Sequence, residues 1–145
     1  MAALSKSKGT MVYVPMDTRP VSKDYTVATM QAAGWDILVP PEELLSSLDR
    51  DGQPDKLLEW LEQNAREAVA VVASADALIY GGLVDSRTHH VEPSVLQSRA
   101  ERLLSLIQKR HSPDIYVFVT IMRSPKTVLS EASVGTSGCR RTAGR

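Results

Sequence analysis

Charged side chains stand at the ends of three apolar segments of this sequence, and their types are suited to binding a polar ligand. The arginines are Arg19, Arg87 and Arg123, and the aspartates are Asp17 and Asp76. A guanidinium group is planar and donates paired hydrogen bonds to a carboxylate or phosphate. An aspartate can balance such arginines, act as a general base or bind a metal ion. We therefore expect the arginines to orient an acidic ligand group, with Asp17 or Asp76 as the catalytic residue that handles protons.

The stretch "IYGGLVDSR" adds a second group of candidate ligand-binding residues. They are Tyr80, Gly81, Gly82 and Ser86, which precede Arg87. The glycines would allow a close backbone approach to a ligand or a positive φ angle in a tight turn. Their spacing does not match a Walker or dinucleotide-binding loop, so they do not predict a phosphate site of that kind. Tyr80 would either stack on a sugar or aromatic ring or close the edge of the core.

Structural roles explain some of the same residues equally well. Asp17 and Arg19 could form an ion pair at the end of a strand, and Asp76 could cap a helix or brace a loop. His89 and His90 are adjacent and point in different directions on a regular element, which favours surface positions. No further ligands at suitable spacing accompany them, so no metal site is predicted, and the cofactor is left open.

Composition limits the classes of partner. Of 145 residues, 43% are hydrophobic and 23% are charged, which is typical of a globular chain, and seventeen basic residues balance seventeen acidic ones. This balance argues against binding to nucleic acid or to an anionic membrane. The first residues, "MAALSKSKGT", lack the apolar core of a signal peptide, and no run reaches membrane-spanning length. We therefore expect a cytoplasmic protein that binds a small molecule.

Alternating sequence patterns predict the elements that must position these residues. Four apolar segments are read as strands, at 10–17, 35–41, 69–82 and 114–123. Between them, helical patterns run over 22–33, with Ser22 as N-cap and Gly34 after its end, and onward from Pro54 and Pro93. The second of these helices has one apolar stripe, formed by Leu57, Leu58, Leu61, Ala65 and Ala68. The third has another, formed by Leu96, Ala100, Leu103, Leu104 and Ile107.

Strands that alternate with helices predict an α/β fold with a parallel sheet covered on both faces. This arrangement suits either the first part of a barrel or a Rossmann-like domain. Active sites in such folds form at the carboxyl ends of the strands, which is where the charged residues fall.

Four blocks of the sequence are similar to a bacterial family, the domain of unknown function 4127. The blocks are "VYVPMDTRPVSKDY", "LVPPEELL", "ADALIYGGLVDSR" and "VTIMRSP", which span about residues 11–125. The resemblance implies that the family's motif positions are Asp17, Arg19, Pro20, Asp76, Tyr80, Gly81, Gly82, Ser86, Arg87 and Arg123. It brings no established activity with it.

The same resemblance implies a domain division. Family members are longer, so residues 1–125 are expected to form the N-terminal portion of an α/β domain. Residues 126–145 lose the hydrophobic periodicity and are expected to be a disordered or non-native tail. Such a fragment would leave a parallel sheet edge exposed, through which copies of the chain could associate.

Three functions remain open at this stage. The first is a truncated piece of an α/β enzyme, such as a hydrolase, acting on a small polar or anionic metabolite, with a carbohydrate derivative favoured. The second is a non-catalytic module that binds a small anion, and the third is a truncated product without independent function. The pKa of the aspartates separates the first two, because a catalytic aspartate titrates above its ordinary value and a salt-bridged one below it.

Overall fold

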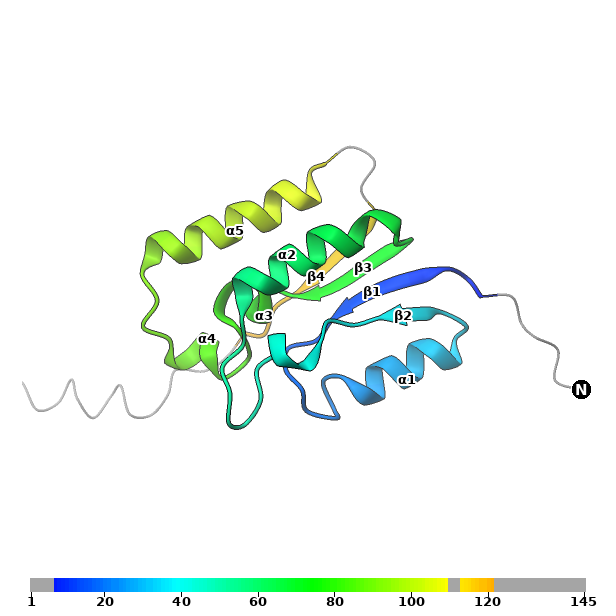
Figure 1. The fold of residues 1–145 in the computed structure, drawn as a ribbon, viewed down its shortest axis with the longest axis horizontal. Coiled ribbons are helices and arrows are strands. Elements are labelled where there is room, and N and C mark those ends of the chain that lie inside the picture. Colours follow the sequence, from blue (N-terminus) through cyan, green and yellow to red (C-terminus); the bar gives the residue numbers. More distant parts are fainter. Residues whose placement is uncertain (1–6, 110–112, 122–145) are drawn as a thin grey trace, which may run out of the picture.

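A four-stranded, all-parallel sheet with helices between the strands forms the described part of the chain, residues 7–109 and 113–121 of the computed structural model (Figure 1). The strands are β1 (Thr10–Val14), β2 (Asp36–Leu38), β3 (Ala70–Ser74) and β4 (Asp114–Phe118). Their order in the sheet is β2-β1-β3-β4. The predicted α/β class and parallel sheet are confirmed. Arg123 and the expected tail at 126–145 lie outside the described residues.

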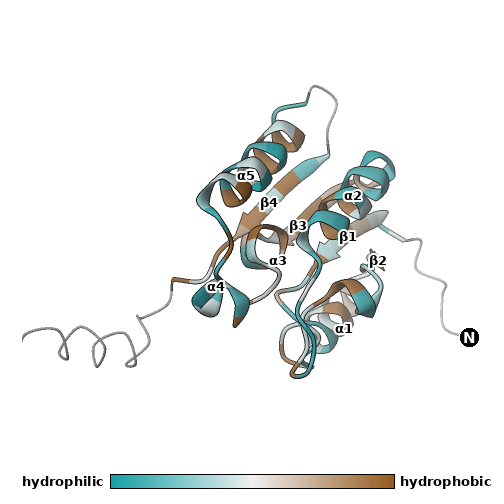
Figure 2. Ribbon diagram, turned by 60° about the vertical axis from the view of Figure 1, so that its left-hand side comes forward, coloured by the Kyte–Doolittle hydropathy of each residue, from teal (hydrophilic) through white to brown (hydrophobic). Residues whose placement is uncertain are grey.

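Helices pack over the sheet and enclose the core. The α-helices are α1 (Asp24–Ala32), α2 (Pro54–Asn64), α3 (Ala75–Tyr80), α4 (Asp85–Thr88) and α5 (Pro93–Ile107), and the 3₁₀ turns are η1 (Glu42–Leu44) and η2 (Ala65–Glu67). Buried side chains of β1 and β3 meet those of α2, α3 and α5, including Val14, Val71, Leu58, Leu78 and Leu103. In Figure 2, β4 is largely hydrophobic, whereas α2 and α5 alternate between hydrophobic and hydrophilic faces. The α1 helix packs beside β2.

Several element boundaries follow the predicted signals. Proline opens both α2 and α5, where its missing N–H removes no helical hydrogen bond. Gly34 follows the end of α1 with φ +91°, a conformation that glycine adopts without strain. The N-cap of α1 is Lys23 rather than the predicted Ser22, and no side chain caps this helix end.

The third apolar segment is not a single strand, which corrects the prediction for residues 69–82. β3 ends at Ser74, and α3 begins at the next residue. The Ser74 hydroxyl accepts a hydrogen bond from the Ala77 N–H at 3.3 Å and so caps the helix. A continuously apolar run does not distinguish a buried strand from a buried helix, which explains the error.

Two further expectations about burial were wrong. In α5, Leu103 and Leu106 are buried, whereas Leu104 of the predicted stripe is 53% exposed. The predicted covering of both sheet faces fails at β4, where Tyr116 is 61% exposed. The row Tyr13–Val72–Tyr116 crosses three strands in register, and it becomes more exposed away from α1. The reason is that α1 packs at the β2 side of the sheet, far from β4.

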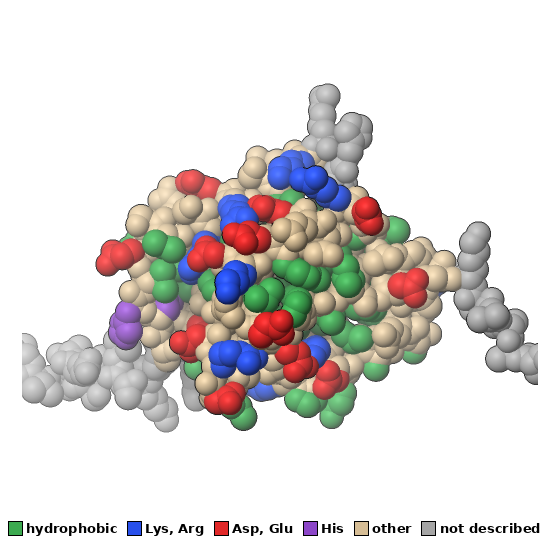
Figure 3. Space-filling view, viewed as in Figure 1, with side chains coloured by type: hydrophobic (Ala, Val, Ile, Leu, Met, Phe, Trp, Pro, Cys, Tyr) green, Lys and Arg blue, Asp and Glu red, His purple; other side chains and the backbone are tan. Residues whose placement is uncertain are grey.

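The surface is mixed in charge. Figure 3 shows acidic and basic side chains interspersed over one face, with hydrophobic side chains between them. Within residues 7–109 and 113–121, no helix combines the length and the hydropathy needed to cross a membrane.

Candidate functional site

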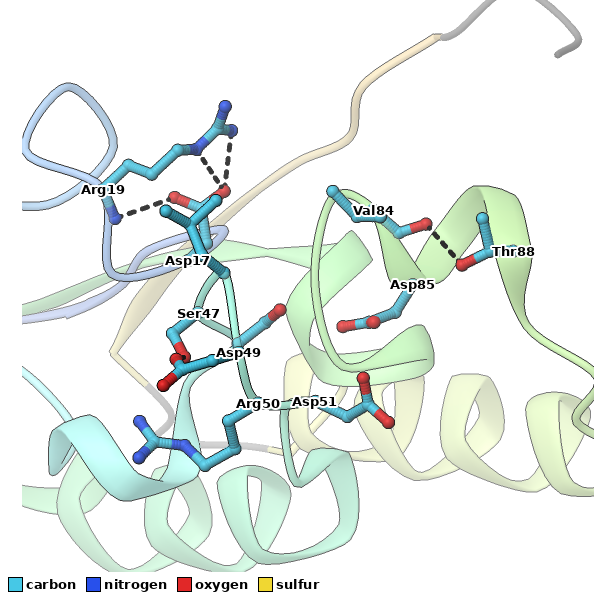
Figure 4. Close-up of a pocket in the computed structure, with 11 residues that line it drawn as sticks. Asp17, Arg19, Ser47, Asp49, Arg50, Asp51, Val84, Asp85 and Thr88 are labelled. Carbon is cyan, nitrogen blue, oxygen red and sulfur yellow. Dashed lines mark hydrogen bonds and ion pairs between the residues drawn. The ribbon is translucent and has the colours of Figure 1, made fainter.

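A pocket of about 470 Å³ lies at the carboxyl edge of the sheet (Figure 4). Three segments form it: the loop after β1, the loop between η1 and α2, and α4. Its charged lining residues are Asp17, Arg19, Asp49, Arg50, Asp51 and Asp85. Its volume falls in the range that small-molecule sites occupy.

Asp17 and Arg19 enter the pocket from the loop that follows β1. The Arg19 backbone N–H donates to Asp17 Oδ1 at 3.1 Å, and its Nε and Nη2 donate to Asp17 Oδ2 at 2.9 and 2.7 Å. Asp17 is only 5% exposed, whereas the Arg19 side chain is 44% exposed. Arg19 therefore holds the Asp17 carboxylate from one side. The two residues form the ion pair that the sequence analysis gave as one alternative.

These contacts set the charge state of Asp17. Burial is the largest single influence and raises its pKa. Three influences lower the pKa: the hydrogen bonds from Arg19, the nearby Ser22 hydroxyl and the positive charge of Arg19. Together they outweigh burial, so that the pKa of Asp17 lies below its ordinary value. Ser22 Oγ itself makes no well-formed hydrogen bond with the described residues. A lowered pKa is the behaviour expected of a salt-bridged aspartate, not of a catalytic acid.

Glycines beside the pocket allow two backbone segments to touch. Gly81 ends α3 with φ +108°. A Cβ atom added to Gly82 would lie 2.5 Å from Ser46 Cβ, and one added to Gly52 would lie 1.9 Å from the Gly81 carbonyl oxygen. The glycine pair therefore packs the loop at 46–52 against the turn between α3 and α4. Gly81 therefore has the positive φ angle that the sequence analysis gave as one alternative, and the close contact in the structure is between protein segments.

Asp85 was not among the predicted site residues, although it lies beside Ser86 and Arg87. Its carboxylate points from α4 toward the loop at 47–51 (Figure 4). Its Oδ2 is buried and has no hydrogen-bond partner among the described residues. The sequence signal that could have identified Asp85 is its position, because it is an acidic residue three positions after the glycine pair, at the start of a short helix.

Asp76 is placed differently from Asp17. It is buried in α3, and its Oδ2 accepts a hydrogen bond from the Thr120 N–H at 2.9 Å. It is not one of the residues that line the pocket of Asp17. This contact ties the end of β4 to α3, as a bracing residue would.

The remaining predicted residues lie around the pocket rather than in it. The Ser86 hydroxyl donates to the Leu83 carbonyl at 2.8 Å within its own turn. The Tyr80 ring packs against His89. Arg87 is exposed in α4 and does not line the pocket, and Arg123 lies outside the described residues. Of the two predicted arginines that the structure describes, Arg19 lines this pocket and Arg87 does not.

The model of one protein family, described as "Protein of unknown function (DUF4127)", matches residues 11–136. The chain belongs to this family. The match continues past Pro125, where the sequence analysis had placed its end, and does not support the expectation that only an N-terminal portion is present. Comparison of this DUF4127 chain with the curated proteins and with the solved structures found no match.

Electrostatics of the DUF4127 pocket favour hydrogen-bond donors as ligands. Four aspartates face two arginines, and both arginines already have partners, because Arg19 binds Asp17 and Arg50 Nη2 donates to the Glu42 carbonyl at 2.7 Å. A hydrogen bond from the Ser47 hydroxyl lowers the pKa of Asp49. Among the residues described, no group of three or more histidine, cysteine, aspartate and glutamate side chains is placed to hold a metal ion.

Proposed function

We propose that this DUF4127 protein binds a small, neutral, hydroxyl-rich molecule, such as a carbohydrate derivative, in the pocket of Asp17 and Asp85. The observation that carries the proposal is the excess of carboxylates over arginines in the lining, with Asp85 Oδ2 buried and without a partner in the described part of the chain. An ionised carboxylate only accepts hydrogen bonds. Ligand hydroxyls would supply the donors that this lining requires.

The charge of the lining separates a neutral ligand from an anionic one. Three aspartates besides Asp17 line the pocket, and Asp17 already neutralises Arg19. A phosphate or carboxylate ligand would meet these like charges, of which Asp49 and Asp51 are exposed, and the repulsion costs free energy. This argument supports the polar ligand of the sequence analysis over the anionic one.

The state of Asp17 supports a binding role for that residue. A general acid must hold its proton near neutral pH, and the lowered pKa of Asp17 opposes this. One carboxylate oxygen of Asp76 accepts a hydrogen bond from the Thr120 N–H, and Asp76 does not line the pocket. We therefore assign Asp17 and Arg19 to shaping the pocket, and Asp85 to contacting the ligand.

Ligand-observed NMR on the full chain tests the proposal with three sets of probes: neutral monosaccharides, uronic acids and sugar phosphates. We expect binding from the neutral sugars and weaker binding from the charged ones. Asp85→Asn should weaken binding about tenfold, because a hydrogen bond to a charged group contributes about 1.5–3 kcal/mol.

Asp36→Asn is the matched control, because Asp36 is exposed at the start of β2, away from the pocket. Its affinity for neutral sugars should equal that of the unmodified protein. Tighter binding of sugar phosphates than of neutral sugars, or equal losses in Asp85→Asn and Asp36→Asn, would contradict the proposal.

A further inference from the structure

A second pocket of about 370 Å³ adjoins the first one. The two pockets share Asp51, Asp85 and Thr88 as lining residues, and the second is also lined by Tyr80, His89 and Arg99. Asp85 therefore stands at the junction, where one ligand could contact both spaces.

His89, which lines the second pocket, is held in place by its neighbours. Its backbone N–H donates to the Asp85 carbonyl at 2.9 Å and closes the last turn of α4. Residues four positions apart on a helical turn project from the same side of it, and His89 follows Asp85 by four positions. The Tyr80 ring packs on the imidazole with centroids 4.8 Å apart and planes inclined at 36°. These contacts hold the ring in place without using its nitrogen atoms.

Arg99, which lines the second pocket, already has partners. Arg99 donates from Nη1 to the Ile79 carbonyl at 2.9 Å, and from Nε and Nη2 to Asp55 at 3.0 and 2.7 Å. Three buried polar atoms have no partner among the described residues, and two of them, His89 Nδ1 and Asp85 Oδ2, belong to residues that line the second pocket. Buried polar atoms in folded proteins are nearly always hydrogen-bonded, so each of these needs a partner.

A hydroxyl group has the chemistry to satisfy both atoms. It can donate to the Asp85 carboxylate while it accepts from an imidazole N–H. We propose that His89 and Asp85 together bind one ligand hydroxyl at the junction, and that the ligand extends into both pockets. The ligand class is then a disaccharide or a glycoside of similar size rather than a single sugar. This inference rests on the proposed function, and it adds the size of the ligand and a role for His89.

Isothermal titration calorimetry on the full chain tests the inference with maltose, cellobiose, lactose and sucrose, and with glucose, galactose and fructose. We expect at least one disaccharide to bind about tenfold more tightly than either of its monosaccharides. His89→Phe keeps a ring against Tyr80 but removes both nitrogens, and should cost the disaccharide about three- to tenfold in affinity, the range of one hydrogen bond.

Two further variants isolate the nitrogen atom. His89→Asn places an amide near the position of Nδ1 and should retain more affinity than His89→Phe. Tyr25→Phe provides the control, because Tyr25 is an exposed aromatic residue of α1 that lines neither pocket. We expect its affinity for the disaccharide to change less than twofold. The imidazole ¹⁵N resonances of His89 in the unmodified protein should also shift on addition of the disaccharide, which needs no variant to fold.

The outcomes separate the two proposals. Monosaccharide binding without any disaccharide advantage, or unshifted His89 resonances at saturating disaccharide, would overturn the inference and leave the proposed function standing. Absence of binding by every sugar would overturn the proposed function itself.

Discussion

At the scale of single residues, the Asp17 carboxylate determines how this part of the molecule responds to pH. Its lowered pKa means that the folded state binds the proton less tightly than the unfolded chain does. The ionised pair with Arg19 therefore stabilises the fold fully above the unfolded value of about 4. That stabilisation is lost as pH falls through the lower value of the folded state.

Asp17→Asn should accordingly lower the free energy of unfolding by about 1–2 kcal/mol at neutral pH, because Arg19 is half exposed and the pair is partly screened. The difference from the unmodified protein should shrink below about pH 4. Urea denaturation at several pH values measures both quantities. Asp55 and Glu62, whose pKa values are lowered by hydrogen bonds from Arg99 and Arg102, are present in both proteins, so their contributions cancel. A difference that stays constant down to about pH 2 would contradict this account of Asp17.

The sequence led to some site residues and not to others, for a physical reason. Asp17 and Arg19 are two positions apart after a strand, so their pairing depends on local geometry alone. Asp85 and His89 both line the second pocket, which depends on the turn of α3 at Gly81 and on the packing of the loop at 46–52 against that turn. Such a contact between distant segments leaves no periodic signal in the chain, so their role could not be predicted.

At the scale of elements, the glycines at 81 and 82 matter as packing positions. Gly82→Ala should cost about 1–3 kcal/mol, because its Cβ would clash with Ser46. Thermal unfolding measures the loss. The second variant Ser46→Gly removes the opposing Cβ, so the double variant should recover part of the stability. Equal stability of Gly82→Ala and the unmodified protein would show that the two segments do not pack as closely as the structure has them.

Asp76 illustrates an element contact that resembles a catalytic signal in sequence. Asp76→Ala leaves the Thr120 N–H without its acceptor, which should cost about 1–3 kcal/mol and speed hydrogen exchange at Thr120. Asp76→Asn retains a carbonyl acceptor and should be affected less. Neither change should alter sugar affinity by more than about twofold if the protein stays folded, because Asp76 does not line the pocket. A large loss of sugar affinity in Asp76→Asn would contradict this account and indicate that Asp76 belongs to the binding site.

Element types were predicted well where length and capping signals agreed, as in α2 and α5 with their opening prolines. They were predicted poorly where an apolar run had to be divided. Residues 69–82 are apolar on both sides of Ser74, so hydropathy alone could not place the change from strand to helix there. The predicted fold class was correct despite this error, because the number and order of the βαβ units do not depend on where the third strand ends.

At the scale of the whole molecule, β4 is one of the two edge strands of the sheet in the part of the chain that the structure describes, and β2 is the other. Tyr116 of β4 and the following Val119 and Ile121 are 61%, 65% and 96% exposed. The expected self-association through a sheet edge remains a prediction, and this edge is the apolar one. Analytical ultracentrifugation should show association that rises with concentration and that Val119→Lys reduces. A protein that remains monomeric at all concentrations would contradict the prediction of self-association.

The central claim is that carboxylates at the carboxyl edge of the sheet bind a neutral, hydroxyl-rich ligand. The most direct measurement is the affinity of neutral sugars for the full chain and for Asp85→Asn, determined side by side with sugar phosphates. We predict that a neutral sugar binds, that Asp85→Asn weakens it about tenfold, and that the phosphorylated sugar binds less tightly. Preferred binding of the phosphorylated sugar, with Asp85→Asn unchanged or improved, would contradict the claim.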